Sequence, residues 1–309
     1  MAYIDGLIGR GVLGRRSRLT MAAREALWGY FFLLPNILGF LIFTLGPVLA
    51  ALFISLTEWD AITAPRFVGV ANYSRLLLQD ETFRKVLVNT VYYTGFSVPC
   101  GTVLALALAL LLNQKLRGVL VYRTVYFLPV ISSMVGVALV WQWLYNAEYG
   151  LINQFLFNLG ITGPKWLAST RWAMPAVIIM SVWKGLGYNI VIFLAGLQDV
   201  PQFLYEAAEL DGANGWQKLR NVTLPMLYPT TFFVIVMSII GSFQAFDQVY
   251  VMTGGGPARA TSVIVHYLYQ SAFQYFEMGY ASAMAYVLFV IIFVVTLVQV
   301  RRSGSMALY

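Results

Sequence analysis

The sequence predicts an all-α membrane protein with six transmembrane helices, and two observations support this fold class. The first is composition: 60% of the 309 residues are hydrophobic and only 11% are charged, with a mean hydropathy of +0.73. Soluble domains carry about 25% charged residues, so this apolar excess indicates a chain that crosses the membrane several times. The second is that six apolar runs each reach the roughly 20 residues that a helix needs to cross a bilayer.

The six runs follow one another along the chain. They are 27–57, the interior of 86–114, 124–147, 172–198, 229–252 and 278–300. Leucine and alanine alternate over 104–110, as in a strand, but a lone strand in lipid would leave backbone polar groups unpaired, so length favours a helix. The runs are also too long for the strands of a transmembrane barrel. We expect a basic N-terminal tail (1–26), a six-span domain (27–302) and a C-terminal tail (303–309).

The distribution of basic residues predicts which side of the membrane each connection faces. The first run contains Pro35 and Pro47 and is too long for the apolar core of a signal peptide, so we expect an uncleaved first span. Cytoplasmic loops are enriched in Lys and Arg. With both ends inside, the inner segments hold 12 of these residues and the outer segments hold 7. The sequence therefore predicts cytoplasmic termini, and this bias explains the net charge of +7 without nucleic acid.

Few residues could support catalysis or bind a metal. Cys100 is the sole cysteine and His266 the sole histidine, so the chain can form neither an internal disulfide nor a histidine-rich metal site. Three glycines in 253–257 superficially resemble a phosphate loop, but no Gly-Lys dipeptide occurs, so there is no Walker A sequence. We expect a turn there, followed by a short outer helix over 262–274. The spans contain no set of catalytic groups, which argues against an intramembrane enzyme.

One long polar segment, 199–229, lies between the fourth and fifth runs. Residues 206–210 favour a helix, which Asp211-Gly212 should end because glycine suits a helix C-terminus. We expect a second short helix over 213–222, ended by Leu224-Pro225. The charge distribution places this helix–turn–helix segment on the cytoplasmic side.

The segment resembles the EAA loop of permeases from binding-protein-dependent ABC importers. The residues that carry this resemblance are Glu206, Ala207, Ala208, Asp211, Gly212, Ala213, Leu224, Pro225 and Pro229. A resemblance to the carbohydrate-type permeases of the MalF and UgpA kind extends over nearly the whole chain from about residue 25. It rests on 69–73, on 195–198 before the loop, and on 246–257, 279–283 and 299–301 after it.

The resemblance implies a type I ABC importer (MetI-like) permease fold in the plasma (inner) membrane of a prokaryote. It further implies a second, different permease subunit, two ABC ATPase subunits that hold ATP and Mg, and an extracytoplasmic solute-binding protein. This chain would itself bind no cofactor and catalyse no reaction. The loop, from Glu206 to Pro225, would dock on an ATPase subunit, and the transported solute would be a sugar or a glycerol phosphate.

Polar residues inside the spans are candidates for the substrate path, because they are costly in lipid and tend to face a bundle interior or an aqueous cavity. In the fourth run these are Lys184, Tyr188 and Asn189. The fifth run combines amides, hydroxyls and aromatic rings, which suit a sugar. Its candidates are Ser238, Ser242, Phe243, Gln244, Phe246, Asp247 and Gln248. Hydrogen bonding between helices remains the alternative role for any of these residues.

Two other functions remain open from the sequence. One is a stand-alone secondary transporter in which Lys184 and Asp247 handle protons or ions. That function would leave the polar 199–229 segment without a purpose. The other is an ABC permease for a non-carbohydrate solute, such as an amino acid or phosphate.

Overall fold

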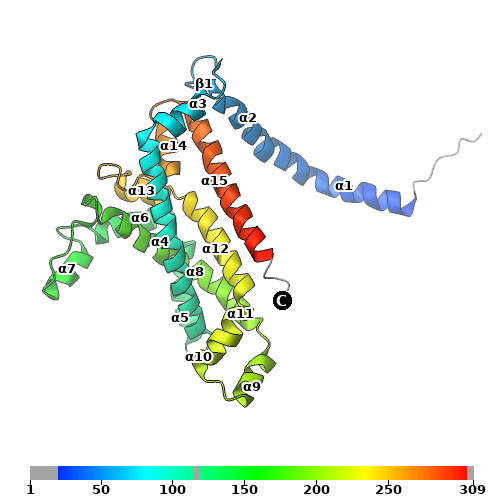
Figure 1. The fold of residues 1–309 in the computed structure, drawn as a ribbon, viewed down its shortest axis with the longest axis vertical. Coiled ribbons are helices and arrows are strands. Elements are labelled where there is room, and N and C mark those ends of the chain that lie inside the picture. The colour runs from blue at the N-terminus through cyan, green and yellow to red at the C-terminus, as the bar shows by residue number, and fades with distance from the viewer. Residues whose placement is uncertain (1–19, 115–117, 305–309) are drawn as a thin grey trace, which may run out of the picture. The chain divides into compact units, whose positions relative to one another are not determined.

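The computed structural model describes residues 20–114 and 118–304 of the chain. Almost all of its elements are helices, as the composition predicts (Figure 1). Within the described residues, four helices are long and apolar enough to cross a membrane, or six spans result if each of two bent helix pairs is one span. Most of the two predicted tails, and the inner-loop residues Lys115 and Arg117, lie outside the described residues.

The chain divides into two units, residues 1–51 and 52–309. Helix α1 (Met21–Phe40), in the first unit, continues through a π-helical turn (Leu41–Leu45) into α2 (Gly46–Ser55), which ends in the second unit. Pro47, which has no N–H to donate to a helical hydrogen bond, lies directly after the π-helical turn. The predicted first span is therefore one helical run.

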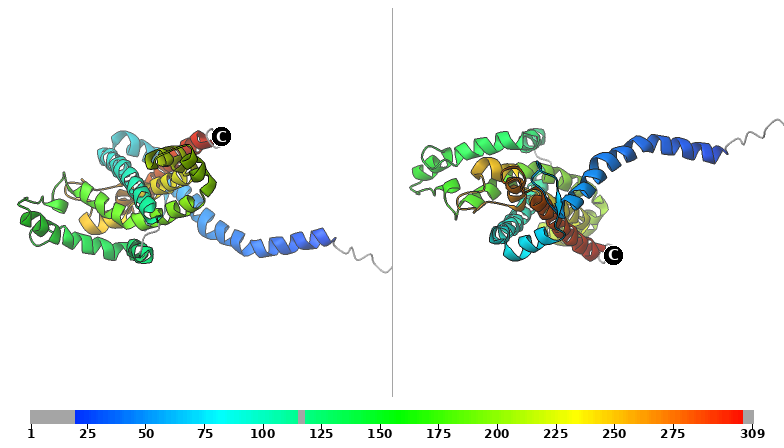
Figure 2. Two further views of the ribbon diagram at one scale, coloured as in Figure 1. Left: turned by 90° about the horizontal axis from the view of Figure 1, so that it is seen from below. Right: turned by 90° about the horizontal axis from the view of Figure 1, so that it is seen from above.

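Two long helices form the centre of the second unit. These are α4 (Glu81–Leu112) and α8 (Ala173–Gln198), which pack along each other. Helix α12 (Tyr228–Phe243) packs against α4, and α14 (Ile264–Phe273) packs against both α4 and α15 (Met278–Gly304), as the side and end views show (Figures 1 and 2). The helices predicted for the second, fourth and sixth runs and the short helix predicted over 262–274 are thereby confirmed.

The third predicted span is not one continuous helix. It forms α5 (Val119–Ile131) and α6 (Met134–Leu144), which meet at an angle of 108°. Pro129 lacks the N–H that would continue the helical ladder, and Ser132 turns its hydroxyl back to the carbonyl of Leu128 at 2.9 Å. Both features favour a break at this point. Helix α7 (Leu151–Asn158) and a 3₁₀ turn (Trp166–Ala168) follow α6 in the chain.

The fifth predicted span is also interrupted. Helix α12 ends at Phe243, and α13 (Asp247–Thr253) begins after three non-helical residues. The N–H groups of Gln244 and Ala245 turn back to carbonyls only three residues earlier, which closes the helix. Gly254 ends α13 with a φ of 55°, the left-handed conformation that glycine adopts readily.

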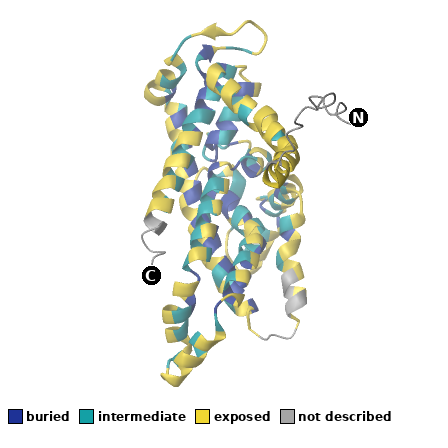
Figure 3. Ribbon diagram, turned by 90° about the vertical axis from the view of Figure 1, so that its right-hand side faces the viewer, coloured by how far each residue is buried: buried dark blue, intermediate teal, exposed yellow. Residues whose placement is uncertain are grey.

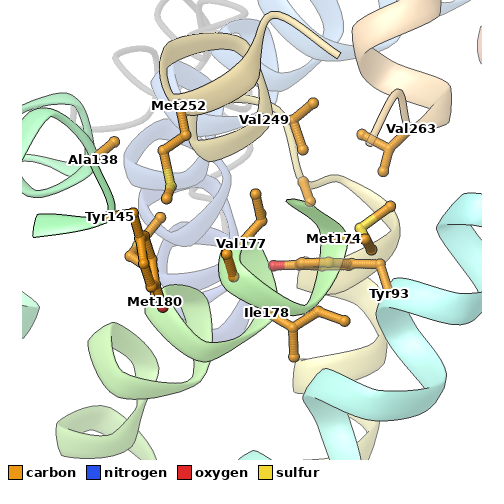
Figure 4. Packing of buried hydrophobic residues seen from close by; sticks show 12 residues of the cluster. Tyr93, Ala138, Tyr145, Met174, Val177, Ile178, Met180, Val249, Met252 and Val263 are labelled. Atoms are coloured by element: carbon orange, nitrogen blue, oxygen red, sulfur yellow. The ribbon is translucent and has the colours of Figure 1, made fainter. Parts of the chain in front are cut away.

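Apolar side chains fill the space between the helices of the second unit. One cluster brings together Tyr93 of α4, Val177 of α8, Val249 of α13 and Ala138 of α6 (Figure 4). These side chains are almost fully buried, whereas the outer faces of the long helices are exposed (Figure 3). Many of those exposed side chains are large and apolar, as expected for faces that contact lipid.

A small β-hairpin and a short helical segment close one end of the second unit. Strands β1 (Thr57–Glu58) and β2 (Arg66–Phe67) pair antiparallel. Helix α3 (Ala71–Ser74) and a π-helical turn (Arg75–Gln79) lead into α4. The hairpin was not expected from the sequence, because two-residue strands carry no detectable periodicity.

Candidate functional site

The polar 199–229 segment folds into two short helical pieces at one end of the second unit (Figure 1). Helix α9 (Gln202–Leu210) starts after Pro201 and ends at Asp211. Gly212 follows with a φ of 75°, a conformation that costs a residue with a side chain about 1–2 kcal/mol. The predicted break at Asp211-Gly212 is therefore confirmed, and glycine is there for a backbone reason.

The turn after α9 is closed by backbone hydrogen bonds to the two alanines. The N–H of Asp211 donates to the carbonyl of Ala207 at 3.0 Å, and the N–H of Ala213 donates to that of Ala208 at 2.9 Å. These bonds use carbonyl groups that the end of a helix otherwise leaves without partners. Both alanines therefore help to fix the turn through their backbone.

The second helical piece is longer than the sequence predicts. It begins with a capping box, in which the side chains of Asn214 and Gln217 each accept a hydrogen bond from the other's backbone N–H. Its parts, in chain order, are α10 (Gly215–Lys218), a π-helical turn (Leu219–Thr223) and α11 (Leu224–Met226).

The prediction that Leu224-Pro225 ends this piece is wrong. Pro225 lies within the helical run, directly after the π-helical turn, and the helical backbone continues past it to Met226. The helical run instead bends by 64° after Met226, where α12 begins.

Two side-chain contacts tie the two pieces to each other. The ammonium of Lys218 donates to the Oε1 of Glu209 at 2.7 Å. The hydroxyls of Tyr205 and Thr223 lie 3.0 Å apart. Glu206 is the fifth residue of α9 and is exposed, and its side chain makes no hydrogen bond or ion pair with the described residues. Glu209 is the acidic residue that holds the loop together.

The outer surface of this loop carries apolar side chains that touch water. Leu210 is 91% exposed, Trp216 67% and Phe203 65%. Large apolar side chains gathered in a charged surface segment are typical of a protein–protein contact. The loop is thus a pre-formed, internally braced element with an apolar surface available to another protein.

A polar cavity of about 330 Å³ lies deeper in the unit, among α4, α8, α12 and the α5–α6 break. Six of the ten residues predicted for the substrate path line it. They are Lys184, Tyr188 and Asn189 of α8, Ser238 and Ser242 of α12, and Gln248 of α13. The sequence therefore located most of the polar groups that the fold brings to this cavity.

Hydrogen bonds hold several of these groups in place. The ammonium of Lys184 donates to the carbonyl of Pro129 at 3.2 Å, at the end of α5 where helical bonding stops. Gln248 donates to the hydroxyl of Tyr93 at 2.9 Å. The hydroxyl of Ser242 can donate to the carbonyl oxygen of Ile239 at 2.9 Å or to the hydroxyl of Thr94 at 3.0 Å. These bonds fix the positions of the side chains but leave further donors and acceptors free to contact a solute.

Ser97 of α4 adds a polar group that has no partner within the described residues. Its hydroxyl is buried and lines the same cavity. A buried hydroxyl without a partner costs free energy, which a bound hydroxyl-rich solute or water would recover. Ser97 belongs to the second apolar run, and nothing in the sequence pattern indicates that it faces a cavity.

Four predicted residues lie outside the cavity. Phe243 is buried in an apolar cluster with side chains of α4, α14 and α15. Phe246 packs on Tyr250 and on Tyr269, with ring centres 5.3 and 5.1 Å apart. The other two, Gln244 and Asp247, are exposed at the α12–α13 break. The break turns this part of the fifth run away from the helix face that carries Ser238 and Ser242.

The backbones of α5 and α8 approach each other closely at one glycine. A side chain at Gly187 would place its Cβ 2.1 Å from the carbonyl oxygen of Tyr126, so the two backbones meet only because the residue is glycine. Gly187 lies one helical turn from Lys184 on α8, and both contact α5. Together they fix the broken helix against the cavity.

Comparison with known proteins identifies the family. The family model for the inner membrane component of binding-protein-dependent transport systems matches residues 97–302. The chain belongs to this family. It is 40% identical to the probable ABC transporter permease YesP of Bacillus subtilis over 91% of this chain and 92% of that protein.

Other relatives carry more specific names. The arabinooligosaccharide permease AraP of Bacillus subtilis is 36% identical over 89% of this chain and 88% of its own length. The trehalose/maltose permease MalF of Thermococcus litoralis is 36% identical over 90% and 94%. A chain of a bacterial alginate ABC transporter, solved with its periplasmic protein, superposes with a TM-score of 0.82 at 25% identity, over 94% of this chain and 98% of that one.

Proposed function

We propose that this chain is a permease subunit of an ABC importer that moves a saccharide into the cell. The observation that carries the proposal is the pairing, in one unit, of a braced surface loop with a polar cavity between long apolar helices. The relatives named for arabinooligosaccharides and for trehalose and maltose favour a mono- or oligosaccharide as the solute. A glycerol phosphate remains within the same proposal.

In this proposal, the loop transmits the motion of the ATPase subunits to the membrane spans. Two ABC subunits bind ATP and Mg, and α9 docks on one of them through the exposed Leu210 and its neighbours. The Lys218–Glu209 bridge and the turn at Gly212 make α9–α11 stiff enough to move as one body. The cavity then opens alternately to either side, and this chain contributes no bond-making step.

The cavity holds the solute during that exchange. Its hydroxyl, amide and ammonium groups offer both donors and acceptors, which a saccharide needs on every face. The remaining wall would come from a second, different permease subunit. A solute-binding protein would deliver the saccharide from outside, and both termini of this chain would lie in the cytoplasm.

Reconstitution tests the proposal against the stand-alone alternative. The complete complex, with binding protein and ATPase subunits in proteoliposomes, should accumulate a labelled oligosaccharide only when ATP is present on the loop side. Accumulation by this chain alone, driven by an ion gradient, would establish a secondary transporter instead. The separation of Lys184, in the cavity, from the exposed Asp247 gives no support to a coupled pair of ion-handling groups.

A charge reversal in the loop tests the coupling role. We expect Glu206→Lys to leave the complex assembled but to reduce ATP-driven uptake at least tenfold, because an exposed charge of the wrong sign would face the ATPase subunit. Glu148→Lys, an equally exposed reversal in a different turn, is the control. Full uptake by the Glu206 variant would remove this residue from the docking surface.

A further inference from the structure

A second and larger cavity lies at the end of the unit opposite the α9–α11 loop. Its volume is about 950 Å³, and it is bordered by the β1–β2 hairpin, the segment from α3 to the following π-helical turn, and the start of α15. Figure 1 shows these elements gathered at one end. Neither the family resemblance nor the central cavity assigns it a role.

Hydrogen bonds and close backbone contacts hold together the elements that surround the cavity. The side-chain amide of Asn72 donates to the carbonyls of Ser55 and Thr57 at 2.9 and 2.8 Å. The N–H of Met278, the first residue of α15, donates to the carbonyl of Trp59 at 2.9 Å. A Cβ at Gly279 would lie 1.9 Å from the carbonyl oxygen of Thr57, so hairpin and helix meet backbone to backbone. These contacts keep the shape of the cavity without a ligand.

Both basic side chains that line the cavity are paired with carboxylates. Arg75 pairs with both carboxylate oxygens of Glu277, at 2.9 and 3.3 Å. Arg66 pairs with Glu58 across the hairpin. Asp60 has no basic partner among the lining residues, and its carboxylate accepts three hydrogen bonds from Ile62 and Thr63. An anionic ligand therefore finds no unpaired basic side chain in this lining, whereas the outer edges of the ion pairs still offer hydrogen bonds to a neutral ligand.

Aromatic rings form another part of the lining. Trp59, Tyr275, Phe276 and Tyr280 all border the cavity. Tyr275 is 50% exposed and Phe276 52%. Phe276 has a φ of 57°, which a bulky residue rarely adopts. Strained residues of this kind persist where the surrounding structure holds them for a purpose. Here the strain keeps an aromatic ring at the edge of the cavity.

We propose that this outer cavity binds a neutral saccharide, with Phe276 and Tyr275 stacking on the C–H faces of the sugar and the Arg75–Glu277 pair bonding its hydroxyls. The volume falls at the upper end of the range for small-molecule sites, about 300–1,000 Å³, and so accommodates a short oligosaccharide. The inference rests on the proposed function, because it takes the ligand to be the same class of solute that the importer transports. It adds a binding site that is separate from the central cavity and carried by this chain alone.

The test uses the complete permease–ATPase complex in nanodiscs without the binding protein. Maltotriose and arabinotriose are the neutral probes and trigalacturonate the charged one, with binding followed by saturation-transfer NMR. We expect neutral probes to bind and Phe276→Gly to weaken them about tenfold, the effect of losing one stacked ring. Glycine adopts a positive φ readily, so this variant is compatible with the backbone conformation at 276, and its unfolding temperature is measured alongside binding. Tyr275→Ala should act in the same direction.

Two controls locate the site. Tyr149→Ala removes an aromatic side chain that is 62% exposed but lies outside the cavity, and it should leave binding unchanged. Tyr188→Ala alters the central cavity and should also leave the outer site intact. Loss of binding through Tyr188→Ala, with Phe276→Gly without effect, would assign the signal to the central cavity and overturn the proposal.

Other outcomes also decide the question. If trigalacturonate binds more tightly than both neutral probes, or if no neutral probe binds, the assigned ligand class is wrong. If Phe276→Gly weakens only the affinity for the binding protein, the cavity receives a protein loop and the saccharide proposal fails. ATP-driven uptake is measured separately: uptake that survives all the outer variants leaves the proposed function standing while this inference falls.

Discussion

Asp80 joins three helices that are far apart in the sequence. One carboxylate oxygen accepts the N–H of Phe83 at 2.9 Å and so caps α4. The other accepts the hydroxyl of Tyr267 in α14, at 2.8 Å, and that of Tyr280 in α15. Partial burial alone would raise the pKa of this carboxyl group, but the hydrogen bonds from Tyr280, Phe83 and Tyr267 outweigh it and lower the pKa. The carboxylate is therefore ionised and serves as a shared acceptor.

We expect Asp80→Asn to lower the free energy of unfolding by about 2 kcal/mol, because the amide still caps the helix but accepts the two tyrosine hydroxyls less well. Thermal unfolding of the purified complex at neutral pH measures the loss. Glu81→Gln, which removes an exposed carboxylate from the next position, is the matched control. Equal unfolding temperatures for the two variants would contradict the role of Asp80.

The pH dependence of that difference has a definite sign. A carboxyl whose folded pKa lies below its unfolded value of about 3.9 stabilises the protein fully above that value. The contribution is lost as the pH falls through the lowered, folded pKa. The gap between wild type and Asp80→Asn should therefore be constant from neutral pH down to about pH 4 and close only in more acidic solution.

Single residues show what the sequence could and could not predict. Gly212 was predictable because a turn after a short helix needs a left-handed residue. The ion pair between Lys218 and Glu209 was not predictable, since it depends on how α10 folds back on α9. The positions of Gln244 and Asp247 outside the central cavity could not be predicted for a similar reason: residues beyond the end of α12 at Phe243 no longer follow the helix face that carries Ser238 and Ser242.

At the scale of whole elements, the two interrupted spans are the main departure from the sequence prediction. Hydropathy measures length and polarity, so it detects the third and fifth runs but not their breaks. The break between α5 and α6 depends on partners elsewhere in the chain. Lys184 from α8 donates to the carbonyl that the break leaves free. Such a polar contact makes non-helical backbone tolerable at membrane depth.

The α5–α8 contact gives the prediction that belongs to this scale. Gly187→Ala should destabilise the complex by about 1–3 kcal/mol, because the new methyl group meets a backbone carbonyl of α5 and the side chain of Val130. Gly185→Ala, two residues earlier on α8, adds the same methyl group where nothing lies within 4 Å. Thermal unfolding and ATP-driven uptake measure both variants.

The two glycine variants must differ for the packing argument to hold. If both lower stability equally, the cost comes from helix α8 itself and not from its contact with α5. If neither does, the two backbones can separate without loss, and Lys184 would not be held at the carbonyl of Pro129. A selective loss in Gly187→Ala, accompanied by reduced uptake, would connect this contact to the shape of the central cavity.

At the scale of the whole second unit, the elements are ordered along one direction. The braced α9–α11 loop lies at one end, the central cavity lies among the long helices, and the hairpin with the outer cavity lies at the other end (Figure 1). The exposed faces between the two ends are apolar. This order is compatible with the basic-residue bias, which independently predicts that the loop lies inside and the hairpin outside.

Membrane orientation is therefore testable with two single-cysteine variants. Cys100, which is exposed, is first replaced by serine. Leu210→Cys then places a thiol on the loop at a position 91% exposed, and Ile62→Cys places one in the hairpin at a position 84% exposed. In cells stripped of any barrier outside the plasma membrane, a membrane-impermeant maleimide should label the Ile62→Cys variant. It should label the Leu210→Cys variant only after the plasma membrane has been permeabilised. The reverse pattern would put the loop outside, where no ATP-driven subunit could reach it, and would contradict both the orientation and the proposed coupling.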